Sequence, residues 1–120
     1  MKFLLVFVGG GFGSALRYFI SNLFQNSEQN FPYATFIVNV AGSFLIGILI
    51  GLSLKNNYLS QQQSLLLVTG FCGGFTTFSA FALENSLFLK NGNFIPLIGY
   101  TVLSIVFGIL AVFFGLFLVK

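Results

Sequence analysis

Four long apolar runs, separated by short polar stretches, constrain this chain more than any other feature of its sequence. A helix that crosses the hydrocarbon core of a bilayer needs about 20 predominantly apolar residues. The predicted membrane helices are Phe3–Phe24, Tyr33–Leu54, Ser64–Leu89 and Ile95–Val119. The polar segments between them, predicted as loops, are 25–30, 55–63 and 90–93. The sequence therefore predicts an all-α membrane protein with a single four-helix domain over residues 1–120.

The composition agrees with a bilayer as the solvent. Hydrophobic residues make up 57% of the 120 residues and charged residues only 6%, whereas soluble domains carry about 25% charged residues. The apolar run after Lys2 resembles a signal peptide at its start, but it continues to Phe24, so a membrane helix is expected. The basic residues form no cluster, so no nucleic-acid partner is expected.

The third apolar run contains an unusual stretch, Gly70–Glu84. Gly70, Gly73 and Gly74 lie close together and are followed by two threonines and a serine. Because glycine disfavours a continuous helix, we expect the third helix to break at these glycines, in the middle of the membrane. Backbone groups freed by such a break are tolerated only inside protein or along a polar cavity, and channels and transporters place their ion sites there. This stretch is the predicted functional centre.

Polar side chains in the second helix support that prediction. Asn39 lies within an apolar run, and Thr35 and Ser43 share its helix face at a spacing of four residues. The Asn39 amide must face protein or a water-filled path, because lipid offers it no partner. It is either a hydrogen-bonding contact between helices or a donor that lines a path for an anion.

Arg17 and two aromatic residues allow two interpretations each. Arg17 lies about 21 Å beyond the start of the first helix, where it either anchors the helix at the interface or draws anions into a vestibule. Phe78 and Phe81 either pack in an ordinary way or present the positive edges of their rings to a small anion.

Three further polar residues lie in the last two helices. Glu84 is expected near the end of its helix, where it meets water, and as an isolated carboxylate it is weak support for a proton-coupled site. Tyr100 and Ser104 are spaced to lie on one helix face. Tyr100 fits an interfacial aromatic belt equally well.

An even number of helices places both termini and the loop at Lys55 on one side of the membrane. That side carries Lys2, Lys55 and Lys120, and the other carries Lys90 and Arg17. Because this positive-inside bias is weak, the chain either inserts in both orientations and pairs with an inverted copy, or takes a single orientation set by a few lysines.

No arrangement of residues indicates an enzyme. The chain has no histidine, and its two carboxylates are not paired. The single Cys72 excludes a cysteine-rich metal site and an intrachain disulfide. The glycine-rich segment 9–13 follows no strand, so it predicts close helix packing and not a phosphate loop.

Three motifs give the chain a resemblance to a known family over nearly its whole length. They are GGGFGSALRY at 9–18, TFIVNVAGSFLIG at 35–47 and GFCGGFTTFSAF at 70–81. The third motif is the most specific, since its glycines, paired threonines and two phenylalanines occur in a defined order. On these motifs the chain resembles the Fluc/CrcB family of fluoride channels.

The resemblance implies an antiparallel, dual-topology homodimer with two parallel fluoride pathways. It also implies a structural sodium ion at the dimer centre, held by the backbone carbonyls of Gly73 and Thr76 from each copy. The implied fluoride pathway is lined by Asn39, Phe78 and Phe81, with Arg17 as the charge at its entrance. Further polar groups along this pathway are implied at Thr35, Ser79, Glu84, Tyr100 and Ser104. The chain departs from the family pattern at Ala80, where the family often has threonine, and at Gly108 and Leu110, where some members carry further hydroxyl groups.

The expected function is passive, fluoride-selective conduction across the inner (plasma) membrane, which exports fluoride that has entered the cell as HF. The expected partners are fluoride, sodium, membrane lipid and a second copy of the chain. A small proton-coupled exporter of organic cations is the alternative, and Glu84 is its only candidate carboxylate within the membrane. A non-conducting assembly subunit is a third possibility, but it would leave the motif at 70–81 unexplained.

Overall fold

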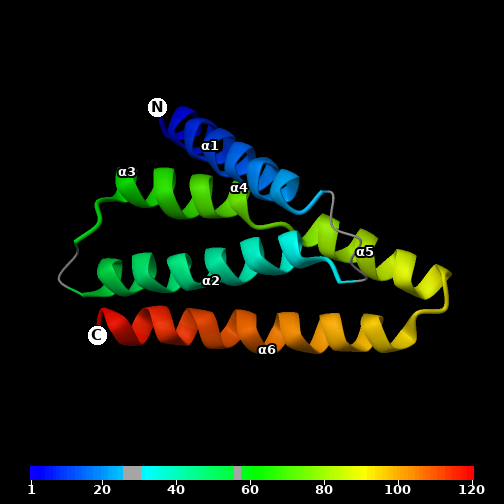
Figure 1. The fold of residues 1–120 in the computed structure, drawn as a ribbon. Helices are drawn as coiled ribbons and strands as arrows, with labels where there is room; N and C mark the ends of the chain where they lie inside the picture. The colour runs from blue at the N-terminus through cyan, green and yellow to red at the C-terminus, as the bar shows by residue number, and fades with distance from the viewer. Residues whose placement is uncertain (26–30, 56–57) are drawn as a thin grey trace.

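A computed structural model of the protein describes residues 1–25, 31–55 and 58–120. Over these residues all the regular secondary structure is helical. Four spans in this part of the chain are long and apolar enough to cross a membrane (Figure 1). Residues 26–30 of the first predicted loop and 56–57 of the second lie outside the described residues. The chain is therefore a multi-pass membrane protein, as its sequence predicts.

Three of the spans are uninterrupted helices. They are α1 (Lys2–Leu23), α2 (Tyr33–Leu54) and α6 (Phe94–Leu118). Their bounds agree with the predicted ranges to within about one residue, because in each case polar residues or Pro32 flank a continuous apolar run.

The third span is built from four consecutive pieces. These are α3 (Gln61–Ser64), the π-helix η1 (Leu65–Cys72), α4 (Gly73–Phe75) and α5 (Phe78–Lys90). The span begins earlier than predicted because Ser60 and Gln63 form a capping box. The Gln63 backbone N–H donates to Ser60 Oγ at 3.1 Å, and the Ser60 N–H donates to Gln63 Oε1 at 3.0 Å.

The third span breaks at two threonines and not at the glycines. Thr76 (φ −83°, ψ 157°) and Thr77 (φ −148°, ψ 124°) are both extended, whereas Gly73 is helical (φ −63°, ψ −36°). Among the described glycines only Gly92, in the turn after α5, has a positive φ (74°). The expected position of the break was therefore wrong. Helix formation across the glycines is favoured because their missing side chains allow another helix to approach.

That helix is α1, and the contact is made by glycines on both sides. Gly9 of α1 faces Gly70 of the third span, and Gly10 faces Gly74. Gly13 packs against the backbone of Phe71 and Phe75. Each side therefore presents a G-x-x-x-G pair, at 9 and 13 and at 70 and 74. A Cβ added to Gly70 would lie 3.1 Å from the Cα of Gly9, and one added to Gly9 would overlap the carbonyl oxygen of Leu66. The predicted close packing of segment 9–13 is confirmed.

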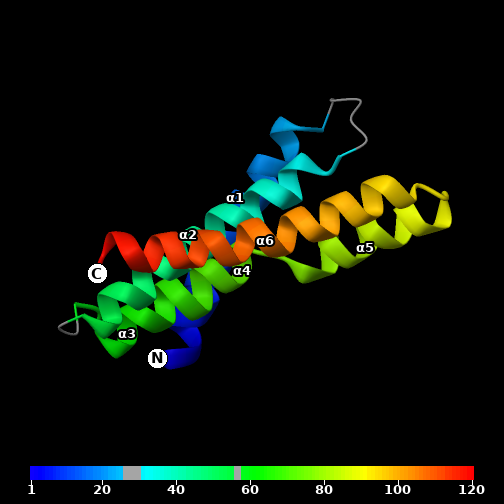
Figure 2. The same cartoon turned by 90° about the horizontal axis from the view of Figure 1, so that it is seen from below.

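The second half of the structure is the pair α2 and α6, which run side by side in the same direction (Figures 1 and 2). Glycines again allow contact, since a Cβ added to Gly115 would lie 2.5 Å from the carbonyl oxygen of Phe44. At their ends Lys55 Nζ donates to the carbonyl oxygen of Lys120 at 3.4 Å. Both termini lie at one end of the molecule, as expected from four spans. Lys55 lies at the same end, since it contacts Lys120.

The protomer buries few side chains and exposes many large apolar ones. Val38, Cys72 and Tyr100 are the largest side chains that are fully buried in the described part of the chain. By contrast, Phe3 is 92% exposed and Phe113 64% exposed. An aqueous protein would not tolerate this much apolar surface, so lipid, and any partner chain, must cover it.

Candidate functional site

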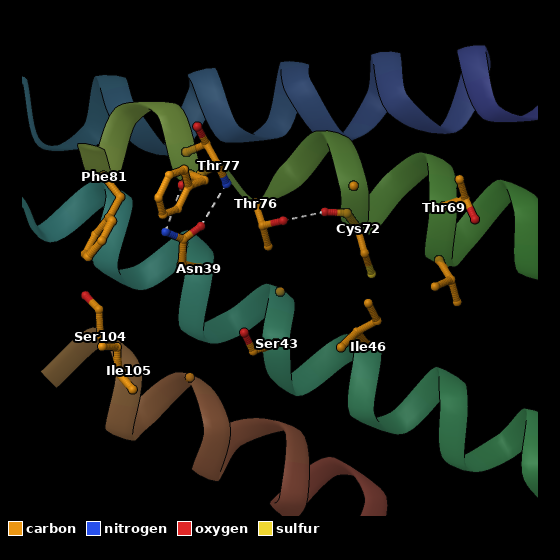
Figure 3. A pocket seen from close by; sticks show the side chains of 15 residues that line it. Asn39, Ser43, Ile46, Thr69, Cys72, Thr76, Thr77, Phe81, Ser104 and Ile105 are labelled. Atoms are coloured by element: carbon orange, nitrogen blue, oxygen red, sulfur yellow. Dashed lines mark hydrogen bonds between the residues drawn. The ribbon is translucent and has the colours of Figure 1, made fainter. Parts of the chain in front are cut away.

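Asn39 holds the break in the third span through both of its amide atoms. Its Nδ2 donates to the carbonyl oxygen of Thr77 at 3.1 Å, and its Oδ1 accepts from the Thr77 N–H at 2.8 Å (Figure 3). The side chain therefore pairs with the extended backbone as a neighbouring strand would. This pairing satisfies the two backbone groups that are most costly to leave unpaired at membrane depth.

The helix ends on either side of the break are capped by the threonines themselves. The Thr76 N–H and Thr76 Oγ1 donate to the carbonyl oxygen of Cys72 at 3.0 and 2.9 Å. Thr77 Oγ1 accepts from the Ala80 N–H at 3.2 Å and so caps the N-terminus of α5. Ser79, which is exposed, lies with its Oγ 3.1 Å from Thr77 Oγ1.

Arg17 also reaches the break. Its Nε donates to the carbonyl oxygen of Gly74 at 3.1 Å, and Ser14 Oγ donates to the same oxygen at 3.4 Å. Arg17 is half-buried, and its positive charge lies at the C-terminal end of the first half of the span, where the helix dipole favours a cation. The guanidinium thus has a partner in the protein interior, which a simple interface anchor would not need.

The carbonyl oxygens of Gly73 and Thr76 lose the donors that a continuous helix would give them. The helical donor to Gly73 would be the Thr77 N–H, which instead donates to Asn39. The helical donor to Thr76 would be the Ala80 N–H, which instead donates to Thr77 Oγ1. Both carbonyls are therefore available as hard oxygen ligands, the type that alkali and alkaline-earth cations prefer. Among the described residues no cluster of His, Cys, Asp and Glu offers another metal site.

A groove of about 560 Å³ opens beside the break, between α2, the third span and α6 (Figure 3). It brings together most of the predicted site residues. Those that line it are Asn39, Gly73, Thr76, Phe78, Phe81 and Ser104. Ser43, Thr69, Cys72, Thr77 and Gly108 also line it. The groove is open on one side, so a second chain or lipid must close it.

The two aromatic residues after the break form a short row. The rings of Phe78 and Phe81 are 5.8 Å apart, and the ring of Phe81 is 5.1 Å from that of Tyr100. Phe78 is 77% exposed. It therefore does not serve as core packing within one protomer, which was the alternative interpretation of this residue.

Glu84 lies in the middle of α5 and is engaged by two hydroxyls. Thr35 Oγ1 donates to one carboxylate oxygen at 2.7 Å, and the Tyr100 hydroxyl donates to the other at 2.8 Å. The expectation that Glu84 stands alone near a helix end was wrong, because α5 continues to Lys90. Tyr100 is 0% exposed, which rules out the interfacial belt position.

A second, smaller cavity of about 190 Å³ lies between α1, α2 and the start of α5. Arg17, Thr35, Thr77 and Glu84 are among the residues that line it. It therefore places the one arginine of the chain and an intramembrane carboxylate around a common cavity, which Thr77 also lines.

Sequence analysis did not single out Thr77, although this residue is the centre of the site. Its backbone pairs with Asn39 and its side chain caps α5. The available signal was that threonine is a preferred N-cap residue. That signal was overlooked because the glycines were taken as the helix breakers.

These features define a small multi-pass membrane protein with a discontinuous helix, whose break Asn39 holds beside a groove. Residues 4–116 match the family described as "CrcB-like protein, Camphor Resistance (CrcB)". The chain belongs to this family.

Curated relatives match this chain over nearly its full length. A protein of Gloeothece citriformis is 48% identical over 121 residues, covering 100% of this chain and 98% of its own. One of Azobacteroides pseudotrichonymphae is 47% identical over 120 residues, covering 99% and 96%. One of Leptospira interrogans is 42% identical over 118 residues, covering 98% and 93%. Each is named "Fluoride-specific ion channel FluC".

Proposed function

We propose that this protein is a fluoride-selective channel that conducts fluoride passively across the plasma (inner) membrane. Support comes from relatives that match the chain over its full length and are named as fluoride-specific ion channels. The structural observation that carries the proposal is the pairing of Asn39 with the Thr77 backbone, which maintains a break in a membrane helix at the edge of the groove. A protein that served only as a scaffold would have no use for such a break.

Selection of fluoride requires groups that replace its tightly held water. Asn39 donates one amide hydrogen to Thr77 and keeps the second for a ligand. Phe78 and Phe81 add positive ring edges, and Ser104 adds a hydroxyl in the same groove. The remaining proposed pathway groups are Thr35, Ser79, Glu84 and Tyr100, with Arg17 as the charge that attracts the anion. No group in this set supplies energy, so fluoride moves down its gradient.

The proposed active unit is an antiparallel homodimer of oppositely inserted copies, with one fluoride pathway on each side. Two observations support a partner on the groove side. Phe78 is largely exposed there, and Gly73 is exposed with open space around its Cα. The even distribution of basic residues between the two ends of the chain is consistent with insertion in both orientations.

A structural sodium ion fits the residues at the break. The carbonyls of Gly73 and Thr76 from two copies would hold it, since neither carbonyl keeps its helical donor. When bound, the ion supplies a fixed positive charge between the copies. The protein's own contribution is to hold these carbonyls outside helical bonding through Asn39 and Thr77.

The function is tested with purified protein in liposomes loaded with fluoride or chloride, by following the release of each ion with a selective electrode. Fluoride release with retention of chloride is the expected result. Equal release of both ions would contradict selectivity. Absence of fluoride release from folded protein would contradict the channel function, and release only under a proton gradient would instead support the exporter.

A further inference from the structure

The hydroxyls in the groove differ in whether they are already engaged. Thr76 Oγ1 donates to the carbonyl oxygen of Cys72, and Thr77 Oγ1 caps α5 and contacts Ser79. These threonines therefore hold the break and have little capacity left for a ligand. A ligand in the groove must use other donors.

Two other hydroxyls line the groove. Ser43 comes from α2 and Ser104 from α6, and both side chains are directed into the groove (Figure 3). Among the described residues neither hydroxyl has a hydrogen-bond partner, and Ser104 Oγ is fully buried. A buried hydroxyl without a partner costs about 1–3 kcal/mol, so its retention in the groove that Asn39 also lines indicates a ligand.

Gly108 explains why Ser43 has room to act. A Cβ at Gly108 would have the Ser43 Oγ as its nearest heavy atom outside its own helix, at 3.8 Å. Gly108 also lines the groove, one helical turn after Ser104. The Ser43 hydroxyl therefore points at the space that a side chain at position 108 would fill.

We propose that Ser43 is a further anion-binding residue of this protein, which acts with Ser104 as a pair of hydroxyl donors to a small hard anion. This inference rests on the proposed function and identifies fluoride as the anion. On this reading a hydroxyl from α2 performs the role that a hydroxyl at position 108 of α6 would otherwise perform. The location of the donor, and not the helix that carries it, is what the anion requires.

The test is fluoride release from liposomes by four forms of the full chain, with the wild type as the reference. The other forms are Ser43→Ala, Ser43→Ala with Gly108→Ser, and Ser43→Ala with Gly108→Ala. Loss of one donor to an anion should slow fluoride release by about tenfold or more in Ser43→Ala. Gly108→Ser should restore most of the rate because it returns a hydroxyl to the same space, whereas Gly108→Ala should not.

Ser53→Ala provides a matched control, since Ser53 lies on the same helix as Ser43 but does not line the groove, and its loss should leave the rate unchanged. Gel filtration of each variant checks that its assembly is retained. An unchanged rate in Ser43→Ala would overturn the proposal, and so would rescue by Gly108→Ala or failure of rescue by Gly108→Ser, because those results assign Ser43 to packing. A wild type that releases no fluoride would instead overturn the proposed function on which this inference rests.

Discussion

Asn39 is the residue on which the break depends, because it satisfies both the N–H and the carbonyl of Thr77. We predict that Asn39→Ala abolishes fluoride release and lowers the stability of the protein in detergent. Each backbone group left without a partner costs about 1–3 kcal/mol. Thermal unfolding and the liposome assay measure the two effects.

Asn93→Ala is the matched control for this change, because Asn93 is the N-cap residue of α6 but its exposed side chain makes no capping hydrogen bond. It should alter neither stability nor release. Full activity in Asn39→Ala would show that the break persists without the amide and would remove the central assignment of the site.

Phe81 connects the exposed ring of Phe78 with the buried ring of Tyr100. We predict that Phe81→Ile reduces fluoride release strongly while the protein remains folded, because isoleucine keeps apolar bulk but has no ring edge. Phe113→Ile, on the lipid-exposed face of α6, is the control and should conduct normally. Equal rates in the two variants would assign Phe81 to packing alone.

At the scale of whole elements, the contact between α1 and the third span depends on the absence of side chains. Gly9→Ala places a Cβ against the backbone of Leu66 and Gly70, and backbone cannot move aside cheaply. We predict destabilisation of about 2 kcal/mol or more, as for other overpacked cores. Thermal unfolding in detergent measures it.

Gly11→Ala is a close control, because a Cβ at Gly11 meets no other group within 4 Å. It should be neutral or slightly stabilising, since alanine favours the helix more than glycine does. If both variants unfold at the same temperature, α1 does not pack on the third span as described.

For the whole molecule, dual topology has a direct test. In a Cys72→Ser background, Lys2→Cys should react with a membrane-impermeant maleimide in about half of the molecules in intact cells, and in all of them after permeabilisation. The native Cys72 is only 1% exposed, so its replacement removes little accessible surface. Labelling entirely from one side would establish a single orientation and exclude inverted pairs.

Sodium binding between two copies should stabilise the assembly by mass action. We predict that exchange of sodium for a large organic cation lowers the unfolding temperature of the purified protein, and that returning sodium restores it. Choline at equal ionic strength serves as the replacement ion. An unfolding temperature that does not depend on sodium would contradict the site proposed at Gly73 and Thr76.

The sequence by itself determined the four spans and which polar residues lie within them. This follows from the bilayer, where an apolar run of sufficient length is a helix and a polar residue inside it needs a partner. Asn39, Arg17 and Glu84 could therefore be singled out as polar groups in apolar runs. Local patterns also gave the close packing at segment 9–13.

Only the tertiary structure decided which groups those residues meet. Asn39 and Thr77 are 38 positions apart, Thr35 and Glu84 49 positions apart, and Arg17 and Gly74 57 positions apart. The position of the break follows from the first of these contacts, since the Asn39 amide stabilises an extended Thr77 while α1 favours helix across the glycines. Local propensity predicts that the helix breaks at the glycines. Long-range hydrogen bonding and packing instead stabilise a break at the threonines.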